Sequence, residues 1–589
     1  MKKNIITIFT LVGALLLTSC DQPVDPKKDR VIALDAVTIA NDGKGITRAP
    51  KSMRIFYKGG SDIPYYSVKD TADFLQTMRQ TKLGNSAYIK YSVQDNKAIM
   101  TNDNNDVVTF DLASQKIIFS DFDSFDNLLT PAKDTLAVIA KGTIPVINSD
   151  DTTYTKGKEF TVDLNTYSRL DIYKSGEDYY IPFTLFNDLF INTHTLFNAI
   201  YNFDSIFFIP TGVKFVATDV FGQQYFTPIG EAYYKNAKEN PQVSKEYAEY
   251  YYQTICLNFD YLYGVKGLHG RDYTSFDTYL STHGYKEDLL SGDVHKMDNA
   301  YQTMLTYLDD FHTATTGTSP LYEYGGSTID KTNLNPAQVE AIEEGKTLDA
   351  ARLFTHTEQG FSYDKRNGIA YITFNEFDAI DDGKLKSKRW TIDDVLGNSA
   401  ILFTYAHRQI TDNYLEDTKY VVVDLATNDG GSSDSLIYIL GLLIGNFTVE
   451  TQNPYTGATT KTNYKVDINL DGKFDEKDVS LREQGLKIVF VTNTHSFSCG
   501  NALPVLAEYA YPDDITILGE TSGGGTCIVR ESFTALGTPY AISGLTMLSK
   551  RDLDNKLISI EDGVDPDIEL DRKFTIDKAR VIAALLNEQ

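Results

Sequence analysis

The stretch KIVFVTNTHSFSCGNALPVLAEYA, Lys487–Ala510, determines how the C-terminal part of this chain folds. Its apolar run Ile488–Val491 predicts a buried strand, and apolar residues at helical spacing predict a helix from about Cys499 to Tyr511. Ser498 stands between the two. Either its side chain caps the helix, or its hydroxyl is a nucleophile beside backbone N–H groups at the positive end of the helix. This segment alone favours the cap, so the rest of the chain has to decide.

The sequence around this junction alternates between strands and helices. Strands are expected at IAYITF, YVVVDL, KIVFVTN and ITILGE. Helices are expected at about Asn398–Asp412, at SLIYILGLLIG, after Ser498 and at about Ile576–Asn587. Alternation of this kind is typical of an α/β domain, which we place at 369–589.

The chain of 589 residues is long enough for several domains. Short β-like runs separated by Asn, Asp and Gly turns predict two β-rich accessory regions, 31–130 and 131–228. Helical periodicity over 229–312 predicts a small helical bundle. Residues 313–368 are rich in Gly, Thr and Ser and are expected to run over the surface. The predicted fold class is therefore multidomain, with a β-rich N-terminal region, a helical bundle and an α/β core.

The composition restricts the partners and the redox chemistry. A formal net charge of -26 argues against nucleic acid or an anionic membrane surface as the main partner. Besides Cys20 the chain has only Cys256, Cys499 and Cys527, an odd number, which excludes a dense disulfide framework. The sequence leaves open whether Cys499 and Cys527 are paired.

The first residues read as an export signal and not as part of the fold. Lys2 and Lys3 precede the short apolar run Ile5–Leu17, which ends in Leu-Thr-Ser-Cys at Cys20 and resembles a bacterial lipobox. We predict a lipoprotein signal peptide at 1–20, an acylated Cys20 and a polar tether at 21–30. The expected location is the bacterial cell envelope, with the lipid in a membrane and the protein on the periplasmic side or the cell surface.

Five short motifs follow one another in the second half of the chain. They are YLDDFHTA, VVVDLATNDGG, NTHSFSCGNA, ILGETSGGG and EDGVDPDI. In this order and spacing they resemble the C-terminal processing (tail-specific) serine peptidases, in the branch that includes the tricorn core protease. The likeness covers roughly 229–589 and not the N-terminal third.

The resemblance implies a crotonase-like (ClpP/crotonase) peptidase core that forms an acyl-enzyme. It assigns the nucleophile to Ser498, the general base to His312 and the carboxylate that orients this histidine to Glu561. These are the groups that a serine nucleophile needs. It assigns the oxyanion hole to the N–H of Cys499 together with that of Gly430 or Gly431.

Three departures from the family pattern stand out. No lysine occurs in Glu520–Gly525, where the bacterial branch carries one, so a serine–lysine pair is not expected. Phe311 occupies the place of the serine that precedes the histidine in the tricorn-like branch, which predicts slow turnover. No PDZ module is evident between His312 and the core.

His495 is a rival base, but it lies only three residues before Ser498 and is expected to point elsewhere.

A second motif, DINLDGKFDEKD at Asp467–Asp478, has the spacing of an EF-hand calcium loop, with Gly472 at the sharp turn. Its ending in aspartate is typical of dockerin-like loops. We predict a structural Ca²⁺ that stiffens an insertion before the Ser498 strand. The predicted ligands are Asp467, Asn469, Asp471, Lys473 through its carbonyl, Asp475 and Asp478.

Together these observations predict an exported, lipid-anchored serine endopeptidase that cleaves peptides or unfolded proteins through an acyl-enzyme at Ser498. No cofactor is expected for catalysis. Two alternatives stay open. One is a catalytically weak or inactive peptide-binding lipoprotein, suggested by Phe311. The other is an adhesion or glycan-binding protein that acts through its β-rich N-terminal region.

Overall fold

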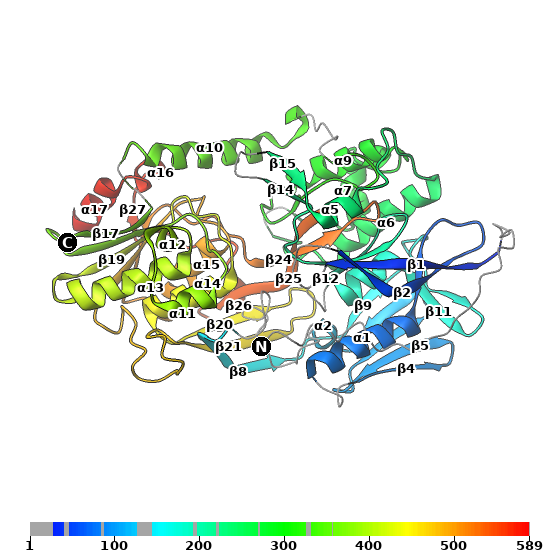
Figure 1. The fold of residues 1–589 in the computed structure, drawn as a ribbon, viewed down its shortest axis with the longest axis horizontal. Coiled ribbons are helices and arrows are strands. Elements are labelled where there is room, and N and C mark those ends of the chain that lie inside the picture. Colours follow the sequence, from blue (N-terminus) through cyan, green and yellow to red (C-terminus); the bar gives the residue numbers. More distant parts are fainter. Residues whose placement is uncertain are drawn as a thin grey trace.

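A computed structural model describes residues 28–39, 46–83, 88–126, 144–192, 197–218, 223–268, 271–324, 331–355, 357 and 359–587. The predicted signal peptide with Cys20 and most of the tether lie outside these residues, and so does the predicted division at 130/131. Figure 1 shows two lobes that share the long strands β24 (Cys527–Phe533) and β25 (Pro539–Arg551). Within the described ranges, no helix has the length and apolar character needed to cross a membrane.

The α/β lobe is built on a six-stranded sheet in the order β17-β18-β19-β22-β23-β27. The strands from β18 to β27 are parallel, and only the edge strand β17 runs antiparallel. The predicted strands of this domain are therefore confirmed. The four predicted strands are β18 (Ile369–Thr373), β19 (Tyr420–Asp424), β22 (Lys487–Thr492) and β23 (Ile515–Gly519), and the two strands that were not predicted are β17 (Gly360–Asp364) and β27 (Ile568–Glu569).

Helices cover both faces of this sheet, which explains why β22 reads as a continuous apolar run. Ile488 and Phe490 point to one face and Val489 and Val491 to the other, and all four are fully buried. The first face is covered by α13 (Ser399–Gln409), α14 (Ser433–Ile444) and α15 (Cys499–Ala510). The second face is covered by α10 (Pro336–Arg352) and α17 (Lys578–Asn587).

A second sheet joins distant parts of the chain. It has the order β16-β25-β20-β21-β8, with β24 and β26 also paired to β25. β8 comes from the N-terminal region, β16 directly follows His312, and the remaining strands belong to the C-terminal part. Their bounds are β8 (Ile147–Thr155), β16 (Ala314–Thr315), β20 (Phe447–Gln452), β21 (Thr459–Val466) and β26 (Leu557–Ser559).

The other lobe combines the β-rich N-terminal region with helices, as predicted. Its two larger sheets have the orders β10-β11-β3-β2-β1-β13-β12 and β4-β5-β6-β7-β9, and a small sheet pairs β14 (Val216–Thr218) with β15 (Gln224–Phe226) (Figure 1). The strands are β1 (Arg30–Ile39), β2 (Ile46–Tyr57), β3 (Tyr65–Ser67), β4 (Ile89–Gln94), β5 (Lys97–Asn102), β6 (Val107–Asp111), β7 (Lys116–Phe119), β9 (Phe160–Asp163), β10 (Tyr173–Ser175), β11 (Asp178–Pro182), β12 (Phe197–Tyr201) and β13 (Ile206–Pro210). The helices include α1 (Val68–Leu83), α4 (Phe183–Phe186), α6 (Lys245–Tyr261), α7 (Phe276–Thr282) and α9 (Val294–Thr306).

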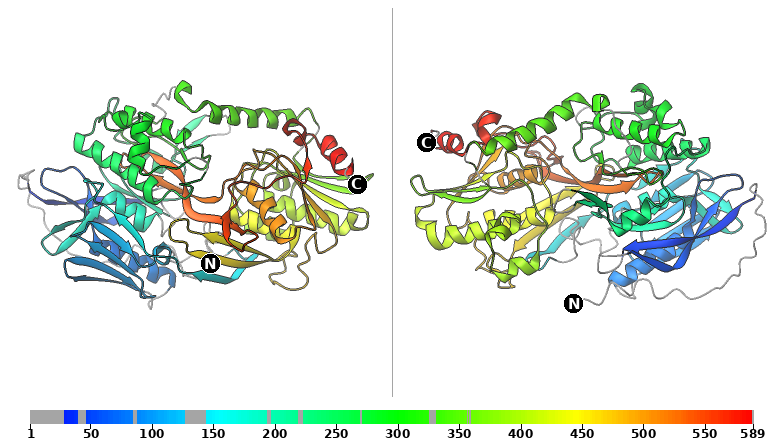
Figure 2. Two further views of the ribbon diagram at one scale, coloured as in Figure 1. Left: turned by 180° about the vertical axis from the view of Figure 1, so that it is seen from behind. Right: turned by 45° about the horizontal axis from the view of Figure 1, so that its top comes forward.

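One hydrophobic core holds this lobe together and includes the C-terminal strands. Leu536, Tyr540 and Ile542 belong to the same buried cluster as α6, α9 and strands of both N-terminal sheets. Figure 2 shows the strands β24 and β25, in orange, entering this lobe in both views. The C-terminal segment therefore carries residues of the α/β lobe into contact with the helices that precede His312.

The helix α10 was not expected, because residues 313–368 were predicted to run over the surface without an assigned element. The Asn335 side chain accepts a hydrogen bond from the Ala337 N–H and Pro336 occupies the first turn, so the start is well capped. Only Gln338, Leu348 and Arg352 are buried, so the helix has no apolar stripe that sequence periodicity could reveal. Figure 1 shows α10 running between the two lobes.

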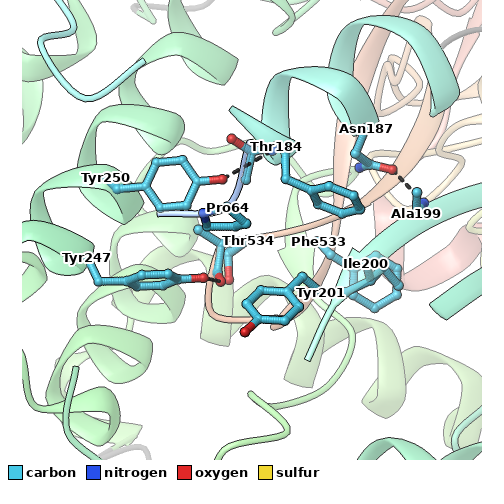
Figure 3. Close-up of a pocket in the computed structure, with 12 residues that line it drawn as sticks. Pro64, Thr184, Asn187, Ala199, Ile200, Tyr201, Tyr247, Tyr250, Phe533 and Thr534 are labelled. Carbon is cyan, nitrogen blue, oxygen red and sulfur yellow. Dashed lines mark hydrogen bonds between the residues drawn. The ribbon is translucent and has the colours of Figure 1, made fainter. Parts of the chain in front are cut away.

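A cavity of about 20 Å³ lies between α4, α6 and β24 (Figure 3). The Tyr247 hydroxyl donates to the Ala535 carbonyl at 2.8 Å, and the Thr184 N–H donates to the Tyr250 hydroxyl at 3.1 Å. A volume of this size holds about one water molecule. None of the residues that line the cavity is a predicted site residue.

Candidate active site

Ser498 occupies a strained turn between β22 and α15. Its backbone has φ 56 and ψ -120, a conformation that non-glycine residues rarely adopt and that costs about 1–3 kcal/mol. The side chain makes no capping hydrogen bond to α15. Its backbone carbonyl instead accepts from the N–H groups of Asn501 and Ala502 at 3.0 and 2.8 Å. The hydroxyl is therefore not used as a helix cap, which was the structural alternative for this serine.

Two glycine loops pack directly against Ser498. A Cβ atom on Gly430 would lie 2.6 Å from the Ser498 Cβ, and one on Gly525 would lie 2.9 Å from the Ser498 nitrogen. Both glycines have positive φ, 109 and 88. The Ser498 N–H also donates to the Gly524 carbonyl at 2.9 Å. Glycine is required at these positions because any side chain would displace the serine.

Hydrogen bonding distinguishes Gly431 from Gly430 as the oxyanion donor. The Gly430 N–H already donates to Asn428 Oδ1 at 3.0 Å. The Gly430 carbonyl accepts from the Phe377 N–H, and the Ser432 N–H donates to the Phe377 carbonyl, so the polar groups of Gly431 face away from Phe377. On that side the Gly431 carbonyl accepts from the Cys499 thiol at 3.3 Å. Because the Gly430 N–H is already engaged, Gly431 is the better candidate for the oxyanion donor.

Asn428 ties these loops together and was not predicted from the sequence. Its amide nitrogen donates to the Phe374 carbonyl at the end of β18, and its own carbonyl accepts from the Phe497 N–H at 3.0 Å. The fully buried Asn428 side chain therefore fixes the Gly430 N–H relative to the end of β18, and the backbone carbonyl of the same residue holds the serine turn. The signal for Asn428 in the sequence is its position between the end of β19 and Gly430.

His312 lies next to the serine turn although it is far away in the sequence. β16 begins two residues later and pairs with β25, the long strand that both lobes share. Two rings contact the Phe497 ring. The centroid of the His312 ring lies 4.8 Å from the Phe497 centroid, and that of the Phe311 ring lies 5.7 Å from it. Phe497 immediately precedes Ser498, so the structure brings the predicted base and nucleophile into one neighbourhood.

The environment of His312 favours the neutral imidazole. The residue is 9% exposed. Burial lowers its pKa, and the negative charges of Asp310 and Glu561 oppose this only in part. The Nδ1 atom is buried and has no hydrogen-bond partner. A neutral imidazole is the form that a general base requires, and the unpaired Nδ1 is free to meet an orienting carboxylate.

Glu561 lies close enough for its charge to act on His312, but its carboxylate is hydrogen-bonded to other groups. Its Oε2 accepts from the N–H groups of Gly525 and Thr526 at 3.1 and 2.8 Å, and its Oε1 lies 3.4 Å from Arg271 Nη1. In the part of the chain that the structure describes, no hydrogen bond joins His312 to Ser498 or to Glu561. The three predicted residues are therefore neighbours that are not yet joined as a triad.

The structure also shows what the rival base His495 and the two cysteines Cys499 and Cys527 contact. His495 Nε2 lies 3.4 Å from Glu344 of α10, and the ring packs against Gly345, so this histidine faces the helix. Burial raises the pKa of the Cys499 thiol to about 12, so the thiol stays protonated. Cys499 and Cys527 are both free thiols and are not paired.

The calcium-like loop turns most of its carboxylates toward its own backbone. Asp467 accepts from the N–H groups of Asp471 and Gly472 at 3.0 and 2.8 Å, and Asp478 accepts from those of Ile468 and Asp475 at 2.8 and 3.0 Å. Across the described ranges, no group of three or more His, Cys, Asp or Glu side chains is placed to hold a metal ion. The Asn469 Oδ1 is buried and has no hydrogen-bond partner.

Comparison with known proteins agrees with this reading of the α/β lobe. Residues 368–570 match the model of Peptidase family S41. No curated protein matches the chain.

Solved structures with similarity include a lipoprotein from Streptococcus agalactiae, at 15% identity over 58% of this chain and 97% of that one, with a TM-score of 0.34. A second is the photosystem II D1 C-terminal processing protease, at 16% identity over 35% of this chain and 42% of that one, with a TM-score of 0.25. A third is the tricorn protease, at 12% identity over 95% of this chain and 64% of that one, with a TM-score of 0.29. Because these overall likenesses are weak, the family model carries the assignment. Residues 368–570 therefore form a domain of peptidase family S41, a family of serine-type peptidases, and the resemblance seen in the sequence motifs is confirmed over these residues.

Proposed function

We propose that this protein is an endopeptidase that cleaves peptides or unfolded proteins through an acyl-enzyme at Ser498. The observation that carries the proposal is the strained serine turn, whose hydroxyl caps no helix and whose neighbour Phe497 contacts the His312 ring. Backbone strain of this kind is kept where the surrounding structure requires it, most often at functional sites.

In the proposed reaction, His312 takes the proton of the Ser498 hydroxyl as the oxygen attacks a substrate carbonyl. The N–H groups of Cys499 and Gly431 hold the oxyanion that develops. The protonated His312 gives its proton to the leaving amine, and then activates the water that hydrolyses the ester. Glu561 stabilises the imidazolium once its carboxylate turns toward Nδ1, which has no other hydrogen-bond partner.

The parallel sheet with helices on both faces supports a crotonase-like core. A polypeptide substrate agrees with the family and with an acidic chain that does not favour nucleic acid. Cleavage of a fluorescently quenched unfolded protein tests the proposal. We expect the wild type to release fluorescence and Ser498→Ala to release none, while His495→Ala cleaves like the wild type. Equal cleavage by Ser498→Ala would reject the assignment.

A catalytically weak or inactive peptide binder is the second candidate. It is favoured by the His312 Nδ1, which has no hydrogen-bond partner, and by Phe311, which is 45% exposed and offers no hydroxyl beside the base. This candidate predicts that the wild type retains a labelled unfolded peptide without cleaving it. Turnover of the same peptide would exclude it.

The N-terminal lobe offers the third candidate, an adhesion or glycan-binding function. An open groove of about 520 Å³ between α1 and β4, lined by Tyr88 and Tyr91, is large enough for a small ligand. Because β8 and the shared core tie this lobe to the α/β lobe, deletion of 31–227 would remove folded contacts. Glycan-array binding by the full chain, compared with Tyr88→Ala, is the appropriate test.

Export and lipid anchoring rest on the sequence motif that ends at Cys20. Metabolic labelling with a fatty-acid analogue should mark the wild type and not Cys20→Ala. Unlabelled wild type in the membrane fraction would reject the anchor and leave only export.

A structural Ca²⁺ in the loop Asp467–Asp478 is supported by its ligand spacing and by the buried, unpartnered Oδ1 of Asn469 at the third position. Calcium should raise the thermal midpoint of the wild type above its value in chelator, and Asp471→Ala should remove the difference. Equal midpoints of the wild type in both solutions would remove the ion from the proposal.

A further inference from the structure

Arg271 is a buried charge close to the candidate site that the proposed reaction does not use. It lies in the segment between α6 and α7 and is 6% exposed. Its Nε donates to the Leu308 carbonyl at 2.7 Å, and its Nη2 donates to the Asp309 carbonyl. Its Nη1 lies 3.4 Å from Glu561 Oε1. One guanidinium therefore joins the turn that leads to His312 with a carboxylate 290 residues further along the chain.

The turn that Arg271 holds is a strained one. Asp309 has φ 52, which a non-glycine residue rarely adopts. Its neighbour Asp310 is buried and accepts from the His312 N–H at 3.0 Å and from the Thr313 hydroxyl at 2.6 Å. The planar guanidinium presents donors in several fixed directions, so it can hold two successive carbonyls and a carboxylate at once. A lysine ammonium in the same place cannot reach all three acceptors.

The charges around His312 explain why a cation is needed there. The two carboxylates that act on it are Asp310, which is 3% exposed, and Glu561, whose side chain is 9% exposed. Tyr263 and Cys527 border the same charges, and burial raises the pKa of both far above their ordinary values, so both are neutral. Arg271 supplies positive charge beside two buried anions.

We propose that Arg271 is a positioning residue of the Ser498 site. It holds Glu561 against the turn that carries His312, and its positive charge lies beside the Glu561 carboxylate. The inference rests on the proposed peptidase function, because only a working base at His312 makes the effect measurable. It adds a residue from the helical region to a site otherwise formed by the serine turn, the glycine loops and Glu561.

Loss of the charge has a predictable direction. Without the cation, the Glu561 carboxylate loses its partner and favours the imidazolium more strongly, so the pKa of His312 rises. His312 must be neutral to accept the Ser498 proton. The acid limb of the rate profile therefore moves to higher pH when Arg271 is replaced by an uncharged residue.

The test measures the rate of fluorophosphonate labelling of Ser498 from pH 5 to 9 in the full chain. We expect Arg271→Met to shift the acid limb upward by about one unit. We expect Arg271→Lys to keep the wild-type limb and to label roughly tenfold more slowly at its plateau, because the geometry is lost while the charge stays. Arg551→Met is the matched control. It also removes an arginine that is paired with a glutamate, but that glutamate is Glu450 in β20 and not Glu561. Its acid limb should equal that of the wild type.

The outcomes separate this inference from the function on which it rests. Wild type that does not label at any pH rejects the proposed peptidase. If the wild type is labelled and the acid limb of Arg271→Met lies at the same pH as that of the wild type, the role of Arg271 is overturned. If Arg271→Met does not fold by thermal melting, Arg271→Lys carries the test, and a wild-type plateau rate in that variant overturns the positioning role.

Discussion

Gly430→Ala tests whether the close approach of the glycine loop to the serine turn matters for activity. The new Cβ would lie 2.6 Å from the Ser498 Cβ and 3.0 Å from the Cys499 nitrogen, and backbone atoms cannot be displaced as cheaply as a flexible side chain. The loop must therefore move away from Ser498, and the Gly431 N–H moves with it. Because a displacement of about 1 Å at a reacting centre can cost about a hundredfold in rate, we expect a loss of that order.

The cost in stability has two parts. Alanine at φ 109 is strained by about 1–2 kcal/mol, and the overlap adds about 1–3 kcal/mol. Gly176→Ala is the matched control, because Gly176 also has positive φ, 61, but a Cβ there would meet nothing within 4 Å. This control isolates the strain, so it should lower the thermal midpoint slightly and leave the labelling rate unchanged.

The assay follows fluorophosphonate labelling of both variants beside their thermal midpoints. Gly430→Ala should fold and label about a hundredfold more slowly than the wild type. A folded Gly430→Ala that labels at the rate of Gly176→Ala would refute the claim that this loop completes the site.

Other predictions concern the same region. Because burial lowers the pKa of His312, the cleavage rate should reach half its maximum below the ordinary range for histidine, and a midpoint above pH 7 would contradict this. Asn428→Ala removes the acceptor of the Gly430 N–H and should lower the labelling rate roughly tenfold or more. The thermal midpoint of the variant shows whether it is folded when the rate is measured. Arg352→Met leaves the fully buried Asp424 without its bidentate partner at 2.8 Å, which should destabilise the fold by about 3–5 kcal/mol. An unchanged thermal midpoint in that variant would refute the importance of this pair.

Local patterns in the sequence predicted the parts of the site that are close together along the chain. The apolar run of β22 and the helical spacing after it located Ser498 correctly between a strand and a helix. The alternation of strands and helices predicted the α/β lobe. These predictions succeed because periodicity records which faces of an element are buried.

Contacts between distant segments could not be predicted in the same way. The proposed role of Arg271 depends on its contact with Glu561. The two residues are 290 positions apart and share no sequence motif. The choice between Gly430 and Gly431 depends on the hydrogen bond that the Gly430 N–H donates to Asn428 Oδ1. The helix α10 has few buried side chains, so its sequence carries no amphipathic signal.

The central claim is that His312, supplied by a distant segment, activates Ser498. Peptide mapping after fluorophosphonate treatment measures this directly in the wild type, His312→Ala and His495→Ala. The account predicts an adduct on Ser498 in the wild type and in His495→Ala, and at least a hundredfold slower labelling in a folded His312→Ala. Labelling of His312→Ala at the wild-type rate would contradict it.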